Sequence, residues 1–297
     1  MKRHITWLFI SVFLGACLRT QMQAPNVQNM PQPEQILAQK KVAFHEKKKS
    51  TSQWPETLGG IVKSDEWIIY KEKEQEEFKG HVSYDNGQYV FKADYALSDR
   101  KRHSATALGN VYLKQKELNT PTIYEAWGDW ATYNYKTGKG ILKSTSKNLA
   151  RLQLTNTVQT ITARAQHISF DTLTRVFILT GDVYAKRTTQ EGIQTVQADK
   201  MTVKQLENYV HMDGHAVLDD GQRTLQADTI IYDGERNHST AYGARPLATG
   251  STEQGTFAII ADTVTSDAQG TVVTLDGRVQ GWVVSPELNN NKINQKF

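Results

Sequence analysis

The chain has a single cysteine, Cys17, among 297 residues, so no disulfide can form within it. Its fold must therefore be held together by packing and hydrogen bonding. Proline is scarce, with seven residues, the mean hydropathy is −0.54, and no long amphipathic helical pattern is found. No Gly-x-Ser-x-Gly nucleophile motif occurs either. These absences disfavour helical folds, disulfide scaffolds and serine or cysteine hydrolases, and we expect no enzyme and no cofactor.

The N-terminus has the pattern of a secretory signal. Lys2 and Arg3 precede the apolar run ITWLFISVFLGA at 5–16, which is too short to span a bilayer comfortably. The run ends in LGAC, which resembles a bacterial lipoprotein box. This resemblance implies lipid attachment at Cys17, with an ordinary signal peptide or an uncleaved anchor as the alternative. Leu18 follows the cysteine where some bacteria use Asp to retain lipoproteins at the inner membrane. The outer membrane is favoured, and the inner membrane stays open.

Basic charge is concentrated beside this signal. Residues 17–53 lack a core pattern and carry a net charge of +4, so they are expected to form a flexible basic tether. Of 35 basic and 31 acidic residues, 27 and 29 lie in 54–297, which leaves the body at about −2. A basic tether suits acidic lipid headgroups, and a plain solvated linker fits equally well. Nothing in the body indicates nucleic-acid binding.

A repeat dominates the body. The phrases TVQADKMTV (195–203) and TLQADTIIY (224–232) are nearly superimposable, and Ala-Asp or a close relative occurs six times at spacings of 29 to 37 residues. A glycine stands fifteen residues after the second member in five of the six copies. The second members are Asp94, Asp129, Gln166, Asp199, Asp228 and Asp262.

Alternating apolar residues around each pair predict strands joined by short polar turns, and hence antiparallel pairing. At the Ala-Asp pair the alternation of apolar and polar positions shifts by one residue, which predicts a β-bulge or corner there. We expect Asp94, Asp129, Asp199, Asp228 and Asp262 to bond free backbone groups at these corners, so that loss of one carboxylate costs about 1–3 kcal/mol.

The units 78–113 and 179–218 resemble the OstA-like family, whose members include the lipopolysaccharide-transport proteins LptA and LptC and the N-terminal domain of LptD. The resemblance rests on Gly-x-Val, Ala-Asp and an alternating strand, as in Gly181, Val183 and Ala198-Asp199. It covers about 75–284, and 114–150 is degenerate. The family implies an all-β, elongated, twisted, open-ended antiparallel jellyroll with an apolar interior, here built from about six repeats of about 33 residues.

The resemblance also implies a function: binding and transport of lipopolysaccharide across the periplasm, with its acyl chains in an apolar trough. Its partners would be lipopolysaccharide and other jellyrolls joined by edge-strand pairing, with the membrane reached through the N-terminal lipid. Ten residues share the inward parity and are candidates to line the trough: Ile168, Phe170, Phe177, Leu179, Met201, Val203, Val210, Met212, Ile230 and Tyr232. Among them, Ile168 starts a strand and is expected to tolerate a charge better than Phe177. A filled core that binds no lipid is the alternative.

Two other classes stay open. His211, Asp213 and His215 alternate on one strand and could bind a metal, but Met212 marks the core parity, so we expect these three to face solvent and no metal site to form. A parallel β-helix, as a structural scaffold or polysaccharide-active enzyme, would have a shorter repeat without hairpins.

The expected organisation is a signal peptide at 1–16, the anchored tether at 17–53, the jellyroll at 54–286 and a disordered tail at 287–297. Two half-bodies meeting near 114–150 are an option within the jellyroll.

Overall fold

The computed structural model describes residues 61–117, 120–144, 148–190, 192–236, 238–252, 255–267 and 272–284. The expected signal peptide, Cys17, the tether and the tail lie outside these residues. The described residues form twenty strands: β1 Ile61–Lys63, β2 Glu66–Tyr70, β3 Gln75–Asp85, β4 Tyr89–Asp99, β5 Ser104–Lys116, β6 Ile123–Asn134, β7 Lys139–Lys143, β8 Ala150–Thr155, β9 Gln159–Ala165, β10 His167–Asp171, β11 Val176–Thr189, β12 Ile193–Lys204, β13 Tyr209–Asp219, β14 Arg223–Asp233, β15 His238–Tyr242, β16 Leu247–Thr252, β17 Gly255–Ile260, β18 Thr263–Asp267, β19 Val273–Asp276 and β20 Gln280–Val284.

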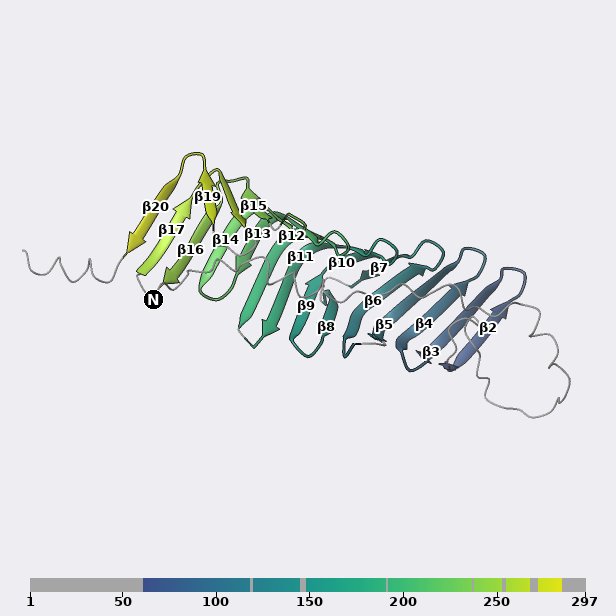
Figure 1. Cartoon of the computed structure of the whole chain (residues 1–297). Coiled ribbons are helices and arrows are strands. Elements are labelled where there is room, and N and C mark those ends of the chain that lie inside the picture. Colours follow the sequence, from purple (N-terminus) through teal and green to yellow (C-terminus); the bar gives the residue numbers. More distant parts are fainter. Residues whose placement is uncertain are drawn as a thin grey trace, which may run out of the picture.

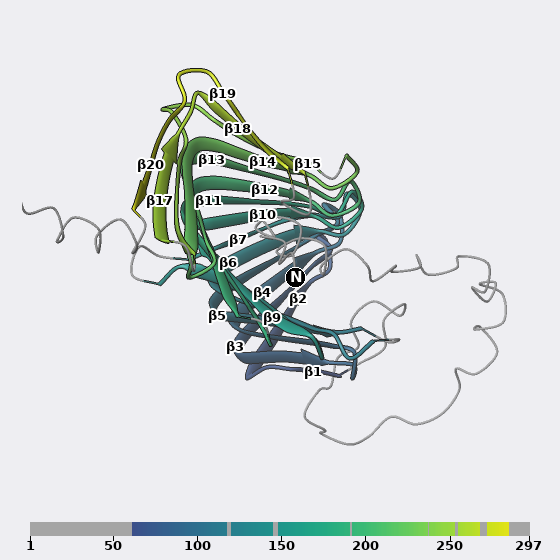
Figure 2. The ribbon, with the colours of Figure 1, turned by 60° about the vertical axis from the view of Figure 1, so that its left-hand side comes forward.

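The strands stack side by side along an elongated, twisted body (Figure 1). Each passage of the chain crosses the body and bends sharply on the way, so that the sheet is folded along its length into two facing halves (Figure 2). Eight long strands, β3–β6 and β11–β14, contribute to both halves, and the other passages are split at the bend into strand pairs such as β9 and β10.

The two halves are continuous ladders. Half-sheet A contains β1, β8, β9, β16, β17 and β20, and half-sheet B contains β2, β7, β10, β15, β18 and β19, each together with one end of every long strand. All pairings are antiparallel, which confirms the predicted all-β antiparallel class and contradicts the parallel β-helix alternative. The stretch 114–150 belongs to the same sheet, because β6 pairs with β5, β7 and β8.

The bend coincides with a shift of register in each of the six pairings between consecutive long strands. The register of β12 against β13 shifts between Gln197 and Lys200, around Ala198-Asp199, and that of β4 against β5 shifts between Lys92 and Tyr95, around Ala93-Asp94. The next strand bends at a glycine with positive φ, such as Gly214 at +75°. A side chain at Gly214 would have its Cβ 2.3 Å from Asp199 Oδ2, so the carboxylate lies directly over the glycine. The fixed spacing of fifteen residues therefore reflects a contact between neighbouring corners.

Four of the five predicted corner carboxylates have a side-chain partner at the neighbouring corner, where we had expected backbone partners. His215 Nδ1 lies 2.9 Å from Asp199 Oδ2, and both side chains are largely exposed. A side-chain contact of this kind recurs along the bend: Asn110 donates to Asp94 at 2.8 Å, Ser144 to Asp129 at 2.7 Å and Arg278 to Asp262 at 3.0 Å. At the corner of Asp228 the contact is between backbone groups, and the Asp228 N–H lies 3.5 Å from the Gly243 carbonyl oxygen. Two more pairs, Asp65 with His81 and Gln166 with Asp182, each at 2.7 Å, extend the row. The Asp65 copy was missed because serine precedes it.

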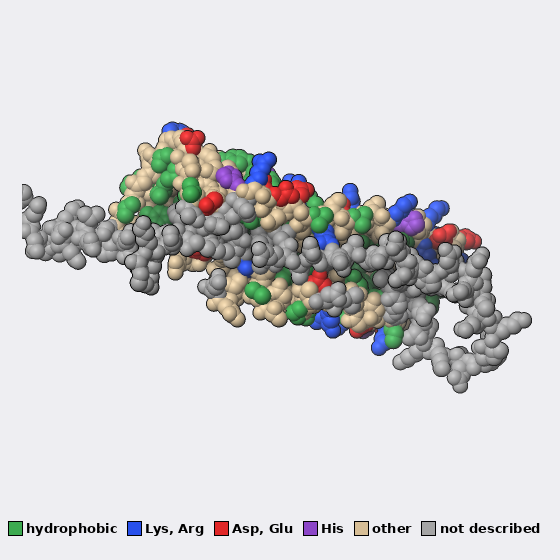
Figure 3. All heavy atoms as spheres, viewed as in Figure 1, with side chains coloured by type: hydrophobic (Ala, Val, Ile, Leu, Met, Phe, Trp, Pro, Cys, Tyr) green, Lys and Arg blue, Asp and Glu red, His purple; other side chains and the backbone are tan. Residues whose placement is uncertain are grey.

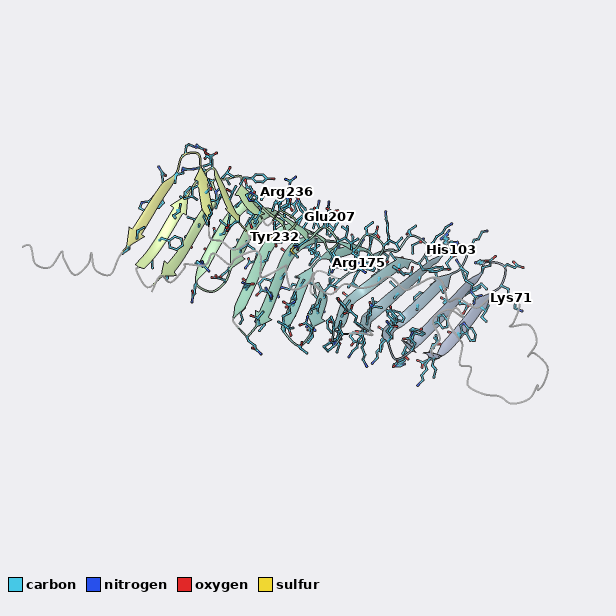
Figure 4. All side chains as sticks on the ribbon, in the orientation of Figure 1. Lys71, His103, Arg175, Glu207, Tyr232 and Arg236 are labelled. Atoms are coloured by element: carbon cyan, nitrogen blue, oxygen red, sulfur yellow. The ribbon has the colours of Figure 1, made fainter. Side chains whose placement is uncertain are left out.

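Polar turn residues at the strand ends act as predicted. The Asp171 carboxylate accepts hydrogen bonds from the backbone N–H groups of Leu173 and Thr174 at 2.9 and 3.0 Å, and these contacts lower the pKa of Asp171. Asp220 accepts from Gln222 and Arg223 in the turn LDDGQ. Such side-chain contacts fix the turn geometry. On the half-sheet B side, successive turns form a charged rim that includes Lys71, His103, Arg175, Glu207 and Arg236 (Figure 4).

The core lies between the half-sheets, close to the bend. One cluster runs from Ala93 to Val264 and draws residues from both halves, and a second around Phe78 closes the N-terminal end. Alanine is frequent in the positions nearest the corner, where the two halves converge and leave room only for small side chains. No helix among the described residues is long and apolar enough to cross a bilayer.

Candidate functional site

The ten inward residues predicted from parity lie together on the inner face of half-sheet B. They come from β10–β14 and form two cross-strand rows. The row nearer the corner is Ile168, Leu179, Met201, Met212 and Ile230. The row nearer the rim is Phe170, Phe177, Val203, Val210 and Tyr232. Since the rows are continuous from strand to strand, they form one apolar surface along the body.

The two rows differ in their exposure. All five residues of the corner row are buried, as are Val210 and Tyr232 in the rim row. Phe170, Phe177 and Val203 are half-buried. The corner row therefore belongs to the core that joins the half-sheets, and the apolar surface that reaches solvent lies along the rim row. A ligand could use the rim row without disturbing the fold.

This difference corrects our expectation for Ile168. Its exposure is 0%, and it is paired between Leu142 on β7 and Leu179 on β11. A carboxylate there would be buried without a partner, at a cost of several kcal/mol. Phe177 and Val203 are the better positions for a test of ligand binding.

The rim row begins with an aromatic stack at its β10 end. The Phe170 ring stacks on Tyr133 at a centroid distance of 6.0 Å, and it lies over Gly140 on the strand between them. A Cβ at Gly140 would come within 2.2 Å of the Phe170 ring. The glycine therefore lets two aromatic side chains from separate strands meet over it. The sequence pattern did not indicate this contact, because 114–150 does not fit the repeat.

Half-sheet A supplies the opposite wall, and it changes in polarity away from the corner. Leu152, Ala163 and Leu225 are half-buried and pack against the core. Farther from the corner, Arg187 is 4% exposed and its Nε donates to Gln159 Oε1 at 2.6 Å. Arg223 pairs with Asp220 at 3.1 Å. The wall is thus apolar in its depth and polar near its edge. We did not predict Arg187 or Arg223 as part of the inner face.

Two hollows lie along the inner face. A cavity of about 30 Å³ between the half-sheets at the C-terminal end is lined by Leu225, Ala241 and Val264, and it has room for only one or two waters. A wider hollow of about 480 Å³ opens at the N-terminal end beside Trp67 and Ile69. Charged groups, including the Glu76–Arg100 pair, border the second hollow. All residues lining the second hollow come from β2, β3 and the turns at the rim of half-sheet B.

The three candidate metal ligands do not converge. His215 faces Asp199 at the corner. The rings of His211 and Tyr209 are edge-on, with their centroids 6.5 Å apart. Asp213 accepts a hydrogen bond from the Thr229 hydroxyl at 3.3 Å. Across the part of the chain that the structure describes, no group of three or more potential metal ligands is found.

A family model matches more than half of this chain. The model of the LptA and LptD N-terminal domain LPS transport proteins matches residues 61–205 and 183–238. A solved structure, LptH, described as the LptA-homologous periplasmic component of the lipopolysaccharide transport device of Pseudomonas aeruginosa, is 16% identical in sequence with a TM-score of 0.35. The match covers 42% of this chain and 84% of LptH. No curated protein matches.

Proposed function

This chain belongs to the family of LptA and LptD N-terminal domain LPS transport proteins, and we propose that it carries lipopolysaccharide through the periplasm with the acyl chains against its inner face. The observation that carries this proposal is the rim row of half-sheet B, in which Phe170, Phe177 and Val203 are half-buried and which faces the apolar part of half-sheet A. Together they offer an apolar strip that is open along one side.

The physical need for such a strip is large. Each methylene removed from water is worth about 0.8 kcal/mol, so acyl chains cannot cross an aqueous space uncovered. A strip open on one side covers the chains and leaves the sugar in solvent. Polar residues near the edge, such as Arg223, suit the boundary between the two.

Transfer along the periplasm requires a continuous path, and the ends of the sheet suit end-to-end pairing. At the C-terminal end, Trp282 and Val283 on β20 are 54% and 68% exposed. Within the described residues β20 pairs with β17 alone, so its other edge is open. Figure 3 shows hydrophobic side chains on the surface at this end. An open apolar edge favours strand addition by another jellyroll.

The N-terminus fits the same role. Lipid attachment at Cys17 followed by the basic tether would hold the jellyroll at a membrane, with the outer membrane favoured by Leu18. This part of the proposal rests on the sequence pattern alone. The family is one of transport proteins, and we propose no enzymatic step.

Binding and stability can be separated by one pair of variants. Val203→Glu places a charge on the rim row, whereas Thr202→Glu places the same charge on the outer face of the same strand. We expect Val203→Glu to reduce lipopolysaccharide binding strongly and Thr202→Glu to leave it unchanged, with melting followed for both. If Val203→Glu stays folded and binds as well as the wild type, the apolar strip is not the binding site.

A further inference from the structure

The outer face of half-sheet A carries a row in which aromatic and basic residues meet across six neighbouring passages of the chain. In order along the sheet the row is Lys92, Tyr112, Trp127, Arg151, Arg164 and Tyr184, each directly opposite the next. We call these six residues the outer row. At the usual strand spacing the outer row is about 24 Å long.

Contacts within the outer row hold the cations against the rings. The Arg151 guanidinium lies 4.0 Å from the centre of the Trp127 ring, and that of Arg164 lies 4.7 Å from the Tyr184 ring. The Lys92 Nζ lies 6.0 Å from the centre of the Tyr112 ring. A guanidinium stacked on a ring keeps its N–H groups at the edge available for anions. The outer row therefore presents positioned donors on a flat surface.

Positive charge is concentrated here, although the body as a whole is slightly acidic. Lys114 and Lys186 stand in the adjacent outward positions on the side away from the bend, together with Glu125. On the bend side, each of three carboxylates lies two residues from the outer row and is already engaged by a side-chain partner: Asp94 by Asn110, Asp129 by Ser144 and Asp182 by Gln166. Glu125 is already engaged, since it accepts from the Tyr112 hydroxyl at 2.5 Å and lies 3.9 Å from Lys114. Burial and this carboxylate raise the pKa of Tyr112 to about 12, so the hydroxyl stays a donor. Within the described residues, Lys92, Arg151 and Arg164 form no ion pair with a carboxylate.

One feature of the outer row costs stability. Arg151 and Arg164 are directly opposite each other on β8 and β9, and like charges in that position are unfavourable. Farther along the same face, the corresponding residues on β12 and β13 are Gln197 and Val217, so the charge is confined to the first half of the body. A shared anion would offset the repulsion between the two arginines.

The position of the outer row argues against a headgroup held in the groove. Tyr112 is two residues from the bend at Asn110 and faces away from the inner surface. The space between the two half-sheets opens on the other side of the body, at the edges farthest from the bend. We propose that the outer row docks the jellyroll on the surface of an anionic phospholipid bilayer. Tyr and Trp rings suit the headgroup layer, and a flat array of this length fits a surface with many phosphates.

Sedimentation with vesicles tests this inference. The full chain, with Cys17→Ala in every protein so that no lipid can be attached, is mixed with vesicles of phosphatidylcholine, with or without phosphatidylglycerol. We expect binding only when phosphatidylglycerol is present, and a loss of at least about tenfold in Arg151→Glu/Arg164→Glu. The matched control is Lys139→Glu/Lys200→Glu, which makes the same charge change on exposed residues of the outer face of half-sheet B and should bind as the wild type does.

The basic residues of 17–53 are present in all three proteins, so their contribution cancels. Binding by Arg151→Glu/Arg164→Glu equal to the wild type, or an equal loss in the control, would overturn the inference. So would wild-type protein that ignores these vesicles and instead binds a soluble sulfated polysaccharide. If the glutamate variant does not fold, Arg151→Gln/Arg164→Gln removes the charges without reversing them and is judged by the same outcomes.

Discussion

The contact between Asp199 and Gly214 can be measured by comparing two glycines. Gly214 has φ +75°, and an added Cβ would lie 2.3 Å from Asp199 Oδ2. Gly221 has φ +84°, and nothing lies within 4 Å of its added Cβ. Alanine in this left-handed region costs about 1–2 kcal/mol, so Gly221→Ala should lose that amount.

Gly214→Ala should lose more, because Asp199 must also leave its rotamer, which adds about 0.5–1.5 kcal/mol. The combined loss is therefore about 1.5–3.5 kcal/mol, and each kcal/mol lowers Tm by roughly 2–4 °C in a body of this size. Removal of the carboxylate should remove part of this additional loss, because the contact with Oδ2 disappears while the Cβ of residue 199 stays 2.8 Å from the added Cβ. In an Asp199→Ala background, Gly214→Ala should therefore cost less than it does in the wild type, but still more than Gly221→Ala.

Urea denaturation of these variants at one pH, with the free energy of unfolding from each curve, provides the comparison. The reasoning is refuted if Gly214→Ala and Gly221→Ala are equally destabilised in the wild-type background, or if Asp199→Ala fails to reduce the cost of Gly214→Ala. In either case the fifteen-residue spacing would not reflect contact between corners.

Three further predictions concern other parts of the body. Ile168→Ala should lose about 2–5 kcal/mol as a cavity opens in the core, whereas Val203→Ala, half-buried at the rim, should lose distinctly less by chemical denaturation; equal losses would place both in one core. The hydrogen bond and charge of Asp199 raise the pKa of His215, so NMR titration of Asp199→Asn should show that pKa falling, and an unchanged value would contradict the contact. Because the folded-state pKa is the higher one, the stabilisation is fully present below the unfolded pKa and is lost as pH rises through the folded pKa. Ultraviolet titration should show Tyr112 ionising near pH 12, and Glu125→Gln should lower that value; a Tyr112 that ionises at the ordinary tyrosine pKa would contradict its burial beside Glu125.

The sequence predicted the inner face of half-sheet B well because strands have a strict period of two. The same parity that grouped Met201 with Val203 places them on one face, and the turn residues Asp171 and Asp220 could be recognised from local chemistry. The alternation could not show how deeply each residue of that face is buried. Ile168 and Phe177 share a face, yet one is fully buried and the other is half-buried, because burial depends on how the two half-sheets diverge from the bend.

Contacts between strands with different sequence patterns could not be predicted from the sequence either. The partner of each corner carboxylate varies among His215, Asn110, Ser144 and Arg278, so no single motif marks it. Arg187 lies on the inner face of half-sheet A, in a position where an apolar residue would be expected from the pattern. The stack of Tyr133 on Phe170 joins strands separated in sequence by the degenerate stretch.

The central claim is that the rim row contacts the acyl chains of lipopolysaccharide. Photo-crosslinking probes at Phe177 and Val203 on the inner face, with Ile178 and Thr202 as outward controls on the same strands, test it most directly. We expect lipopolysaccharide adducts from the two inner probes and none from the two outer ones. Adducts from the outer pair alone, or from none of the four while lipopolysaccharide still binds the protein, would contradict the claim.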